Sequence, residues 1–121
     1  MGTWQPWTEV LDRNNTRVQL WSGSWSSGNI TVPDFDKYTV FIIRVSSNGA
    51  RILAVADSGC FRGGTIYALT SSAHSIQVNA TYSGTSLTWG YCNRFSHLEG
   101  SAHNGFYDGG SCSIIEIWGV I

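Results

Sequence analysis

The chain has few charged residues and very little proline. Only 12% of its 121 residues are charged, and two are proline; the usual charged share is roughly 25%. The net charge is −1 and the seven basic residues are scattered along the sequence. A face that binds nucleic acid needs concentrated positive charge, so we expect no nucleic-acid partner, and no attachment to an anionic membrane for the same reason.

Long apolar runs are missing as well. No window approaches the roughly 18 consecutive apolar residues of a membrane-spanning helix. The stretch from Met1 to Pro6 lacks the basic and apolar regions of a signal peptide. We therefore expect a soluble protein that is made in a cytoplasm and does not insert into a membrane.

Cysteine is too sparse for a disulfide framework. Cys60, Cys92 and Cys112 are odd in number and widely spaced. We expect free thiols that are buried and pack as small hydrophobic groups. A single bridge that forms in an oxidising medium after release is the alternative.

The residues that are abundant favour an all-β fold. Hydrophobic residues make up 42% of the chain, and glycine, serine and threonine are frequent. Short strands in which neutral polar residues alternate with buried ones have this composition. We predict a lead-in segment over residues 1–15 and one domain over residues 16–121, an antiparallel β-sandwich of jelly-roll type with minimal helix.

Local patterns give the first strands and one hairpin. Two short strands are predicted, joined by a Ser/Gly-rich connection that contains Trp25. A third predicted strand is apolar on both faces, and the Asn48-Gly49 dipeptide, a strong hairpin signal, joins it to the next strand. These four strands are expected at Thr16–Trp21, Asn29–Val32, Tyr38–Val45 and Arg51–Ala56.

The clearest alternation of apolar and polar residues follows. Ile76, Val78, Ala80 and Tyr82 share one face of a predicted strand, and Ser83-Gly84 forms the turn. Leu87, Trp89 and Tyr91 alternate with small residues on the returning strand. The sequence therefore predicts a hairpin with an aromatic-rich inner face and an outer face rich in hydroxyls and amides.

The pattern ends in a glycine-rich stretch from His97 to Ser111, which we expect to be a loop. Its aromatic and polar residues are unusual for a simple connector, and loops on a rigid sheet often carry binding residues. The alternative is that Phe106 and Tyr107 tuck under the loop and cover an end of the sheet. The candidate ligand-binding residues in this stretch are His103, Asn104, Phe106, Tyr107 and Asp108. Trp25, from the earlier Ser/Gly-rich connection, is a further candidate.

Catalytic motifs are not evident. No serine lies in a G-x-S-x-G elbow, the acids sit mostly singly in turns, and the glycine-rich flank of Cys60 suits a packed thiol. Several metal-ligating residue types fall in one stretch, but their spacing matches no zinc motif. They are Cys92, His97, Glu99, His103, Asp108 and Cys112. We expect no enzyme, no cofactor and no metal within one subunit, although a three-fold axis that gathers His97 or His103 from three chains stays open.

Aromatic residues are the stronger clue to function. Six tryptophans and five tyrosines exceed what one small core needs. Sugar rings stack their C–H faces on such side chains, and sugar hydroxyls bond to Asn, Asp and Ser, so a carbohydrate partner suits this inventory. By their alternation, Trp21, Trp89 and Trp118 are predicted in the core. Trp25, Phe106 and Tyr107 are predicted to be exposed.

Three stretches resemble C-terminal head modules of tail-fibre and tail-tip proteins of bacteriophages and prophages. They are L-W-S-G-S-W-S-S-G-N-I-T-V at Leu20–Val32, D-K-Y-T-V-F-I-I-R-V at Asp36–Val45, and I-I-E-I-W-G-V-I at Ile114–Ile121. The resemblance implies a trimeric β-sandwich head at the tip of a virion appendage that binds a host surface glycan or cell-wall polymer. It carries over no functional residue, because its shared positions are architectural.

Three functions follow as expectations. The first is a non-enzymatic receptor-binding domain of a virion tail fibre. The second is a structural trimerisation and capping domain without receptor contact, and the third is a small hydrolase of wall polysaccharide. In a trimer, Phe41, Ile43 and Ile115 are expected to face outward and line the contact between subunits.

Overall fold

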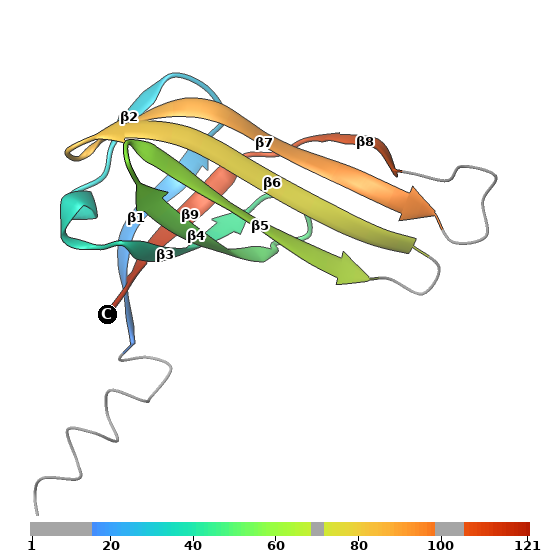
Figure 1. Ribbon diagram of the computed structural model, residues 1–121, viewed down its shortest axis with the longest axis horizontal. Coiled ribbons are helices and arrows are strands. Elements are labelled where there is room, and N and C mark those ends of the chain that lie inside the picture. The colour runs from blue at the N-terminus through green and yellow to red at the C-terminus, as the bar shows by residue number, and fades with distance from the viewer. Residues whose placement is uncertain (1–15, 69–71, 99–105) are drawn as a thin grey trace, which may run out of the picture.

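The computed structural model describes residues 16–68, 72–98 and 106–121, and in these residues nine strands form one antiparallel sheet (Figure 1). The predicted lead-in segment lies outside the described residues. One 3₁₀ turn, η2 (Phe35–Lys37), is the only helical element in the described part. The strands are β1 (Arg17–Trp25), β2 (Asn29–Thr31), β3 (Val40–Val45), β4 (Arg51–Asp57), β5 (Cys60–Ala68), β6 (Ser72–Ser83), β7 (Ser86–Leu98), β8 (Phe106–Ser111) and β9 (Ile114–Val120).

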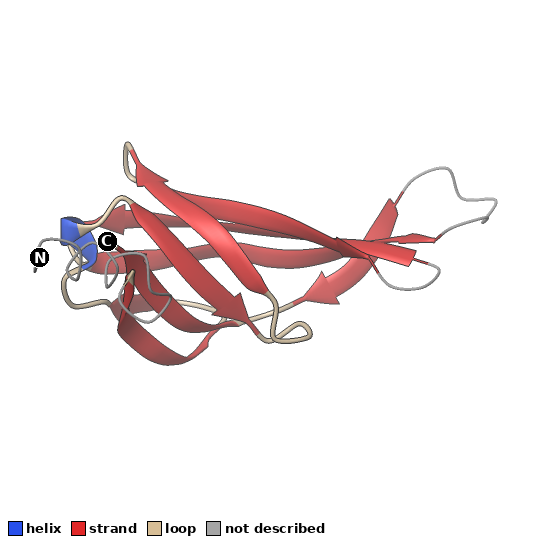
Figure 2. Ribbon diagram, turned by 90° about the horizontal axis from the view of Figure 1, so that it is seen from below, coloured by secondary structure: helices blue, strands red, loops and turns tan. Residues whose placement is uncertain are grey.

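The sheet is strongly curled. Its strand order is β1-β9-β3-β4-β5-β6-β7-β2, and β8 pairs with β7. Strands β1 and β2 stand at opposite ends of this order, yet only residues 26–28 separate them in sequence. The sheet must therefore bend until its two ends approach each other (Figure 2). The predicted all-β, antiparallel fold is confirmed, whereas a division into two stacked sheets is not.

Tight turns connect the first long strands as the sequence predicts. Between β3 and β4, Asn48 has φ 58° and Gly49 has φ 61°. Two consecutive residues with positive φ match the right-handed twist of an antiparallel pair, which is why Asn-Gly is favoured there. Strands β3 and β4 are antiparallel neighbours, with Ile42 opposite Leu53. Ser58 and Gly59 have positive φ in the same way between β4 and β5.

Three phenylalanines form the centre of the core inside the curl. Phe35 of η2 stacks on Phe41 of β3 with ring centroids 4.5 Å apart, and Phe61 of β5 meets both rings edge-on. All three are fully buried. The short η2 turn thus places the Phe35 ring against β3 and β5, two strands that β4 separates in the sheet.

Trp25 is buried, so its predicted exposure was wrong. Strand β1 continues through the expected Ser/Gly connection and ends at Trp25, whose ring lies 5.0 Å from the ring of Trp89 on β7. Its indole nitrogen donates to the carbonyl oxygen of Gly28 at 3.3 Å. Trp25 therefore fills the space where the two ends of the sheet meet, a position that its polar sequence neighbours do not reveal.

A β-bulge changes the face of the predicted hairpin. Ile76, Val78 and Ala80 are buried as expected. Trp89 pairs with Ala80 but Tyr91 pairs with Asn79, so Gly90 is an extra residue in β7. Beyond it the alternation inverts, and Tyr91 points outward while Cys92 is buried. The prediction that Tyr91 belongs to the inner face was wrong because the period of two breaks at this bulge.

Two further expectations need correction. Phe41 and Ile43 are fully buried on the inner face of β3 and are not available to contact another subunit. The stretch expected as one loop contains the end of β7 and the whole of β8, which pair from Asn93 to His97. Trp21 and Trp89 pack against the core as predicted, but Trp118 lies on the outer face opposite Ile42.

Candidate functional site

The outer face of the long β5–β6–β7 ladder carries a set of polar side chains that we call the amide row. Register places Arg62 opposite Asn79 and Asn79 opposite Tyr91, while Gln77 faces Asn93 one step along the same strands. The inner-face residues between them are buried, so these side chains all point to solvent. The amide row consists of Arg62, Gln77, Asn79, Tyr91 and Asn93.

Tyr91 is the one aromatic side chain with high exposure among those that the structure describes. Its exposed fraction is 40%, whereas the other described rings are buried or half-buried. The Gly90 bulge causes this placement, because a Cβ at Gly90 would collide with the carbonyl oxygen of Asn79. The bulge therefore needs glycine, and it turns an aromatic ring into the middle of an amide surface.

A shallow hollow borders the amide row. Gly64 stands between Leu53 and Gln77 in the register and places no side chain between them. A volume of about 450 Å³ lies at this point, within the range of small-ligand sites. Its lining residues are Gly64, Thr65, Ser75, Ile76 and Gln77.

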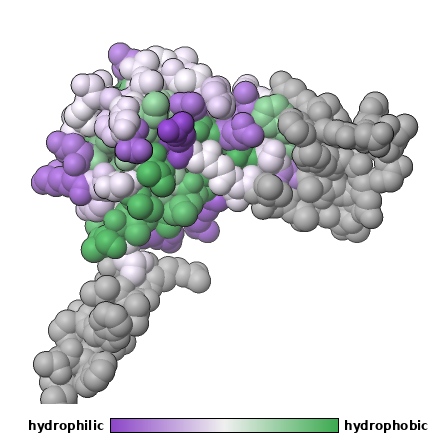
Figure 3. All heavy atoms as spheres, viewed as in Figure 1, coloured by the Kyte–Doolittle hydropathy of each residue, from purple (hydrophilic) through white to green (hydrophobic). Residues whose placement is uncertain are grey.

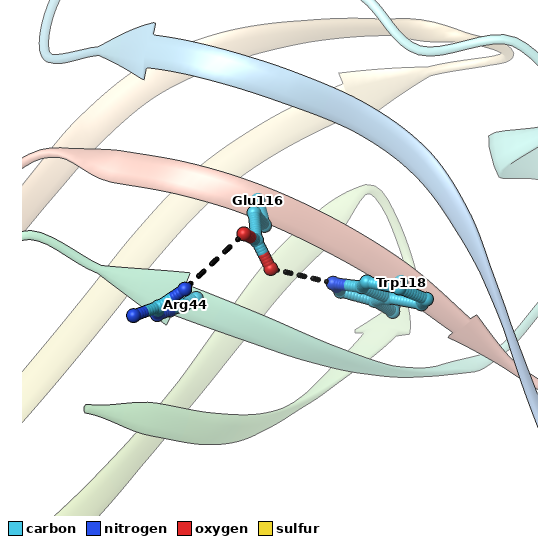
Figure 4. Close-up of polar contacts among 3 residues, drawn as sticks. All are labelled: Arg44, Glu116 and Trp118. Atoms are coloured by element: carbon cyan, nitrogen blue, oxygen red, sulfur yellow. Dashed lines mark hydrogen bonds and ion pairs between the residues drawn. The ribbon is translucent and has the colours of Figure 1, made fainter. Parts of the chain in front are cut away.

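The outer face of β1, β9, β3 and β4 differs from the amide row, and we call it the arginine patch, made of Arg17, Arg44, Arg51, Glu116 and Trp118. Glu116 accepts hydrogen bonds from Arg44 at 3.4 Å and from the indole nitrogen of Trp118 at 2.9 Å (Figure 4). The guanidinium of Arg17 lies 4.9 Å from the centre of the Trp118 ring, a cation–π geometry. Charged and aromatic groups thus cover the outer face of these strands.

Apolar residues adjoin the arginine patch. Leu53 is 61% exposed and Val55 is 41% exposed, both on the outer face of β4. Figure 3 shows a hydrophobic area over β3 and β4, next to the C-terminus. Contiguous exposed apolar side chains with a polar rim are typical of binding surfaces.

The three cysteines are free. Cys92 on β7 and Cys112 just beyond β8 are buried neighbours, and the Cys112 thiol donates to the Cys92 carbonyl oxygen at 3.5 Å. The hydrogen bond with Cys112 and burial raise the pKa of the Cys92 thiol well above its ordinary value. Such a thiol is a poor nucleophile, so it packs as a small hydrophobic group, as the sequence predicts.

The structure separates Trp25 from the other predicted site residues that it describes. Trp25 is buried at the meeting of the sheet ends, whereas Phe106, Tyr107 and Asp108 lie on β8 and pair with His97, Ser96 and Phe95. Trp25 packs on Trp89, and Asp108 pairs with Phe95. The stretch of β7 between these two contacts, from Trp89 to Phe95, is about 20 Å long, so Trp25 and Asp108 lie far apart along the strand. Residues His103 and Asn104 lie outside the described residues. Tyr91, which sequence reasoning placed inside, joins the candidate site instead; its glycine neighbour was the available signal.

Three searches of the chain gave no candidate beyond the outer face. The part of the chain that the structure describes contains no group of three or more His, Cys, Asp or Glu residues that could hold a metal ion. None of its helices has the length and apolarity needed to cross a membrane. Comparison with protein-family models, curated proteins and solved structures finds no match. The chemistry of the outer face is therefore the main guide to function.

Proposed function

We propose that this chain is a non-enzymatic receptor-binding domain, the head of a virion tail fibre, that binds a host surface carbohydrate through the amide row. One observation carries the proposal: Tyr91 is exposed among amide side chains on a rigid antiparallel ladder. A tyrosine ring offers a flat apolar surface for the C–H face of a sugar. Amides supply donors and acceptors for its hydroxyls.

The geometry of the row suits an extended ligand better than a buried small molecule. Arg62, Asn79 and Tyr91 are consecutive across three strands, so they span about 10 Å at a strand spacing of about 4.8 Å. The Gly64 hollow lies beside them. A polymer lying across the strands meets the ring and the amides in sequence.

Binding of the purified chain to bacterial cells and to an array of neutral and acidic glycans tests the proposal. We expect cell binding that free sugar blocks, and a loss of roughly tenfold or more in affinity for Tyr91→Ala, since stacking and burial of one aromatic ring contribute about 1–3 kcal/mol. Val18→Ala, an exposed change near the opposite end of β1 from Trp25, is the control. Equal binding by both variants contradicts the proposal.

A second function, trimerisation and capping of a fibre, is favoured by the exposed apolar side chains of Leu53 and Val55. In that case the outer face of β4 is covered by other copies of the chain. Mass measurement in solution and the cell-binding assay together separate the two functions. A stable trimer that Leu53→Ser dissociates, together with no binding to cells, supports the structural function.

A further inference from the structure

Positive charge is concentrated on the outer face of the sheet. Four of the seven Lys and Arg residues of the chain point outward from four different strands, and two acids, Asp57 and Glu116, share the face with them. The whole chain has a net charge of −1. Among the side chains that the structure describes, the outer face is therefore positive, although the whole chain is not. The four arginines are Arg17 on β1, Arg44 on β3, Arg51 on β4 and Arg62 on β5.

These arginines differ in their partners. Arg44 forms an ion pair with Glu116 at 3.4 Å. Neither Arg51 nor Arg62 forms an ion pair with any acid that the structure describes. Both are exposed, so their guanidinium groups can bind an anion from solution without first breaking an internal pair.

Two of the arginines line one hollow. Arg17 and Arg51 flank a volume of about 380 Å³ whose other lining residues are Thr16 and Ile42. A carboxylate that enters this hollow lies beside arginines from two strands. Arginine binds carboxylates through paired N–H donors, which makes such a contact stronger than a neutral hydrogen bond.

A row of neighbouring residues on the outer face connects this hollow with the amide row. Ile42, at its floor, is opposite Leu53, Leu53 is opposite Gly64, and Gly64 is opposite Gln77. This path from β3 to β6 covers about 14 Å at the usual strand spacing. The path passes over the apolar side chains of Ile42 and Leu53 and then over the Gly64 hollow. Such a surface suits the apolar faces of sugar rings better than further charged groups of a ligand.

We propose that the outer face binds an acidic polysaccharide, with one carboxylate between Arg17 and Arg51 and the neighbouring sugar rings over Leu53 and the Gly64 hollow. This inference rests on the proposed carbohydrate-binding function and names the class of glycan. A second copy of the chain docked face to face is disfavoured, because it brings the unpaired arginines of the two copies together. An extended carboxylated polymer has negative charge that complements the arginines and apolar ring faces that can pack on Leu53.

The experiment compares polygalacturonate with its methyl ester, a polymer of the same sugar without the charge. We expect the full chain to bind the acid roughly tenfold more tightly than the ester and to lose most of this difference at high salt. Arg51→Gln and Arg17→Gln should each weaken binding of the acid by roughly tenfold and leave binding of the ester unchanged. Lys37→Gln, which removes the same charge from η2, is the control and should change neither.

The outcomes separate the inference from the proposed function. Equal affinity for acid and ester, or full binding by both arginine variants, overturns the inference. If Tyr91→Ala still weakens binding of a neutral glycan by roughly tenfold or more, the proposed function stands. If no glycan binds, acidic or neutral, both fail. A trimer that Leu53→Ser dissociates also overturns the inference, because other copies then cover the face. Circular dichroism of each variant establishes that it is folded.

Discussion

In the middle of strand β4, the inner and outer faces of the sheet differ in what covers them more than in how apolar they are. On β4, Ile52 is 1% exposed and its neighbour Leu53 is 61% exposed, although the two side chains have the same size. The inner face is covered because the sheet curls around it. The outer face is not covered within the described part of the chain. Apolar content alone therefore does not identify the core side of such a strand.

The largest expected difference in the free energy of unfolding is between truncation of a large side chain on the inner face and truncation of one on the outer face of the sheet. Phe41→Ala removes a ring that packs on Phe35 and Phe61, and we expect it to lower the free energy of unfolding by about 3–5 kcal/mol. Leu53→Ala on the outer face should change it by less than about 0.5 kcal/mol. Urea denaturation of both variants measures the difference. Similar losses would mean that the outer face of β4 is covered in solution.

The bulge that exposes Tyr91 gives the next contrast. We expect Gly90→Ala to lower the free energy of unfolding by about 1–3 kcal/mol, because its Cβ collides with backbone of β6. It should also weaken glycan binding, since the β6–β7 register shift that turns Tyr91 outward is disturbed. Gly84→Asn in the β6–β7 turn is the control: it has open space, and Asn tolerates its φ of 60°. Normal stability of Gly90→Ala would refute this role.

The smallest contrast concerns two ion pairs of the outer surface. Glu116→Gln removes the charge that Arg44 faces while keeping an acceptor for Trp118, and we expect a loss of about 1 kcal/mol in unfolding free energy that shrinks at high salt. Lys37→Gln breaks the fully exposed pair with Asp34, and we expect no measurable change. Thermal melts at low and high salt check both. A larger effect for Lys37→Gln would contradict this ranking.

Much of the fold is predictable because its signals are local. The Asn48-Gly49 turn, the apolar face of Ile76, Val78 and Ala80, and the near absence of helix all follow from neighbouring residues. The resemblance to virion tail-fibre heads stays a prediction, and its carbohydrate partner stays a proposal.

The site is less predictable because it depends on pairing between distant strands. Glycines in the stretch from His97 to Ser111 suggest a loop, yet pairing with β7 makes β8 a strand. Arg17 on β1, Ile42 on β3 and Arg51 on β4 line one hollow only because the sheet order β1-β9-β3-β4 places these strands near one another. No sequence spacing links these residues.

The sequence by itself determined an antiparallel β fold of neutral strands, because side-chain alternation and turn chemistry act within a few residues. The tertiary structure alone decided that Trp25 is buried and Tyr91 exposed. Curling brings the ends of the sheet together over Trp25 and Trp89, and one extra residue at Gly90 inverts the faces of β7 beyond it. Both effects arise from the closure and register of the whole sheet, which no single segment specifies.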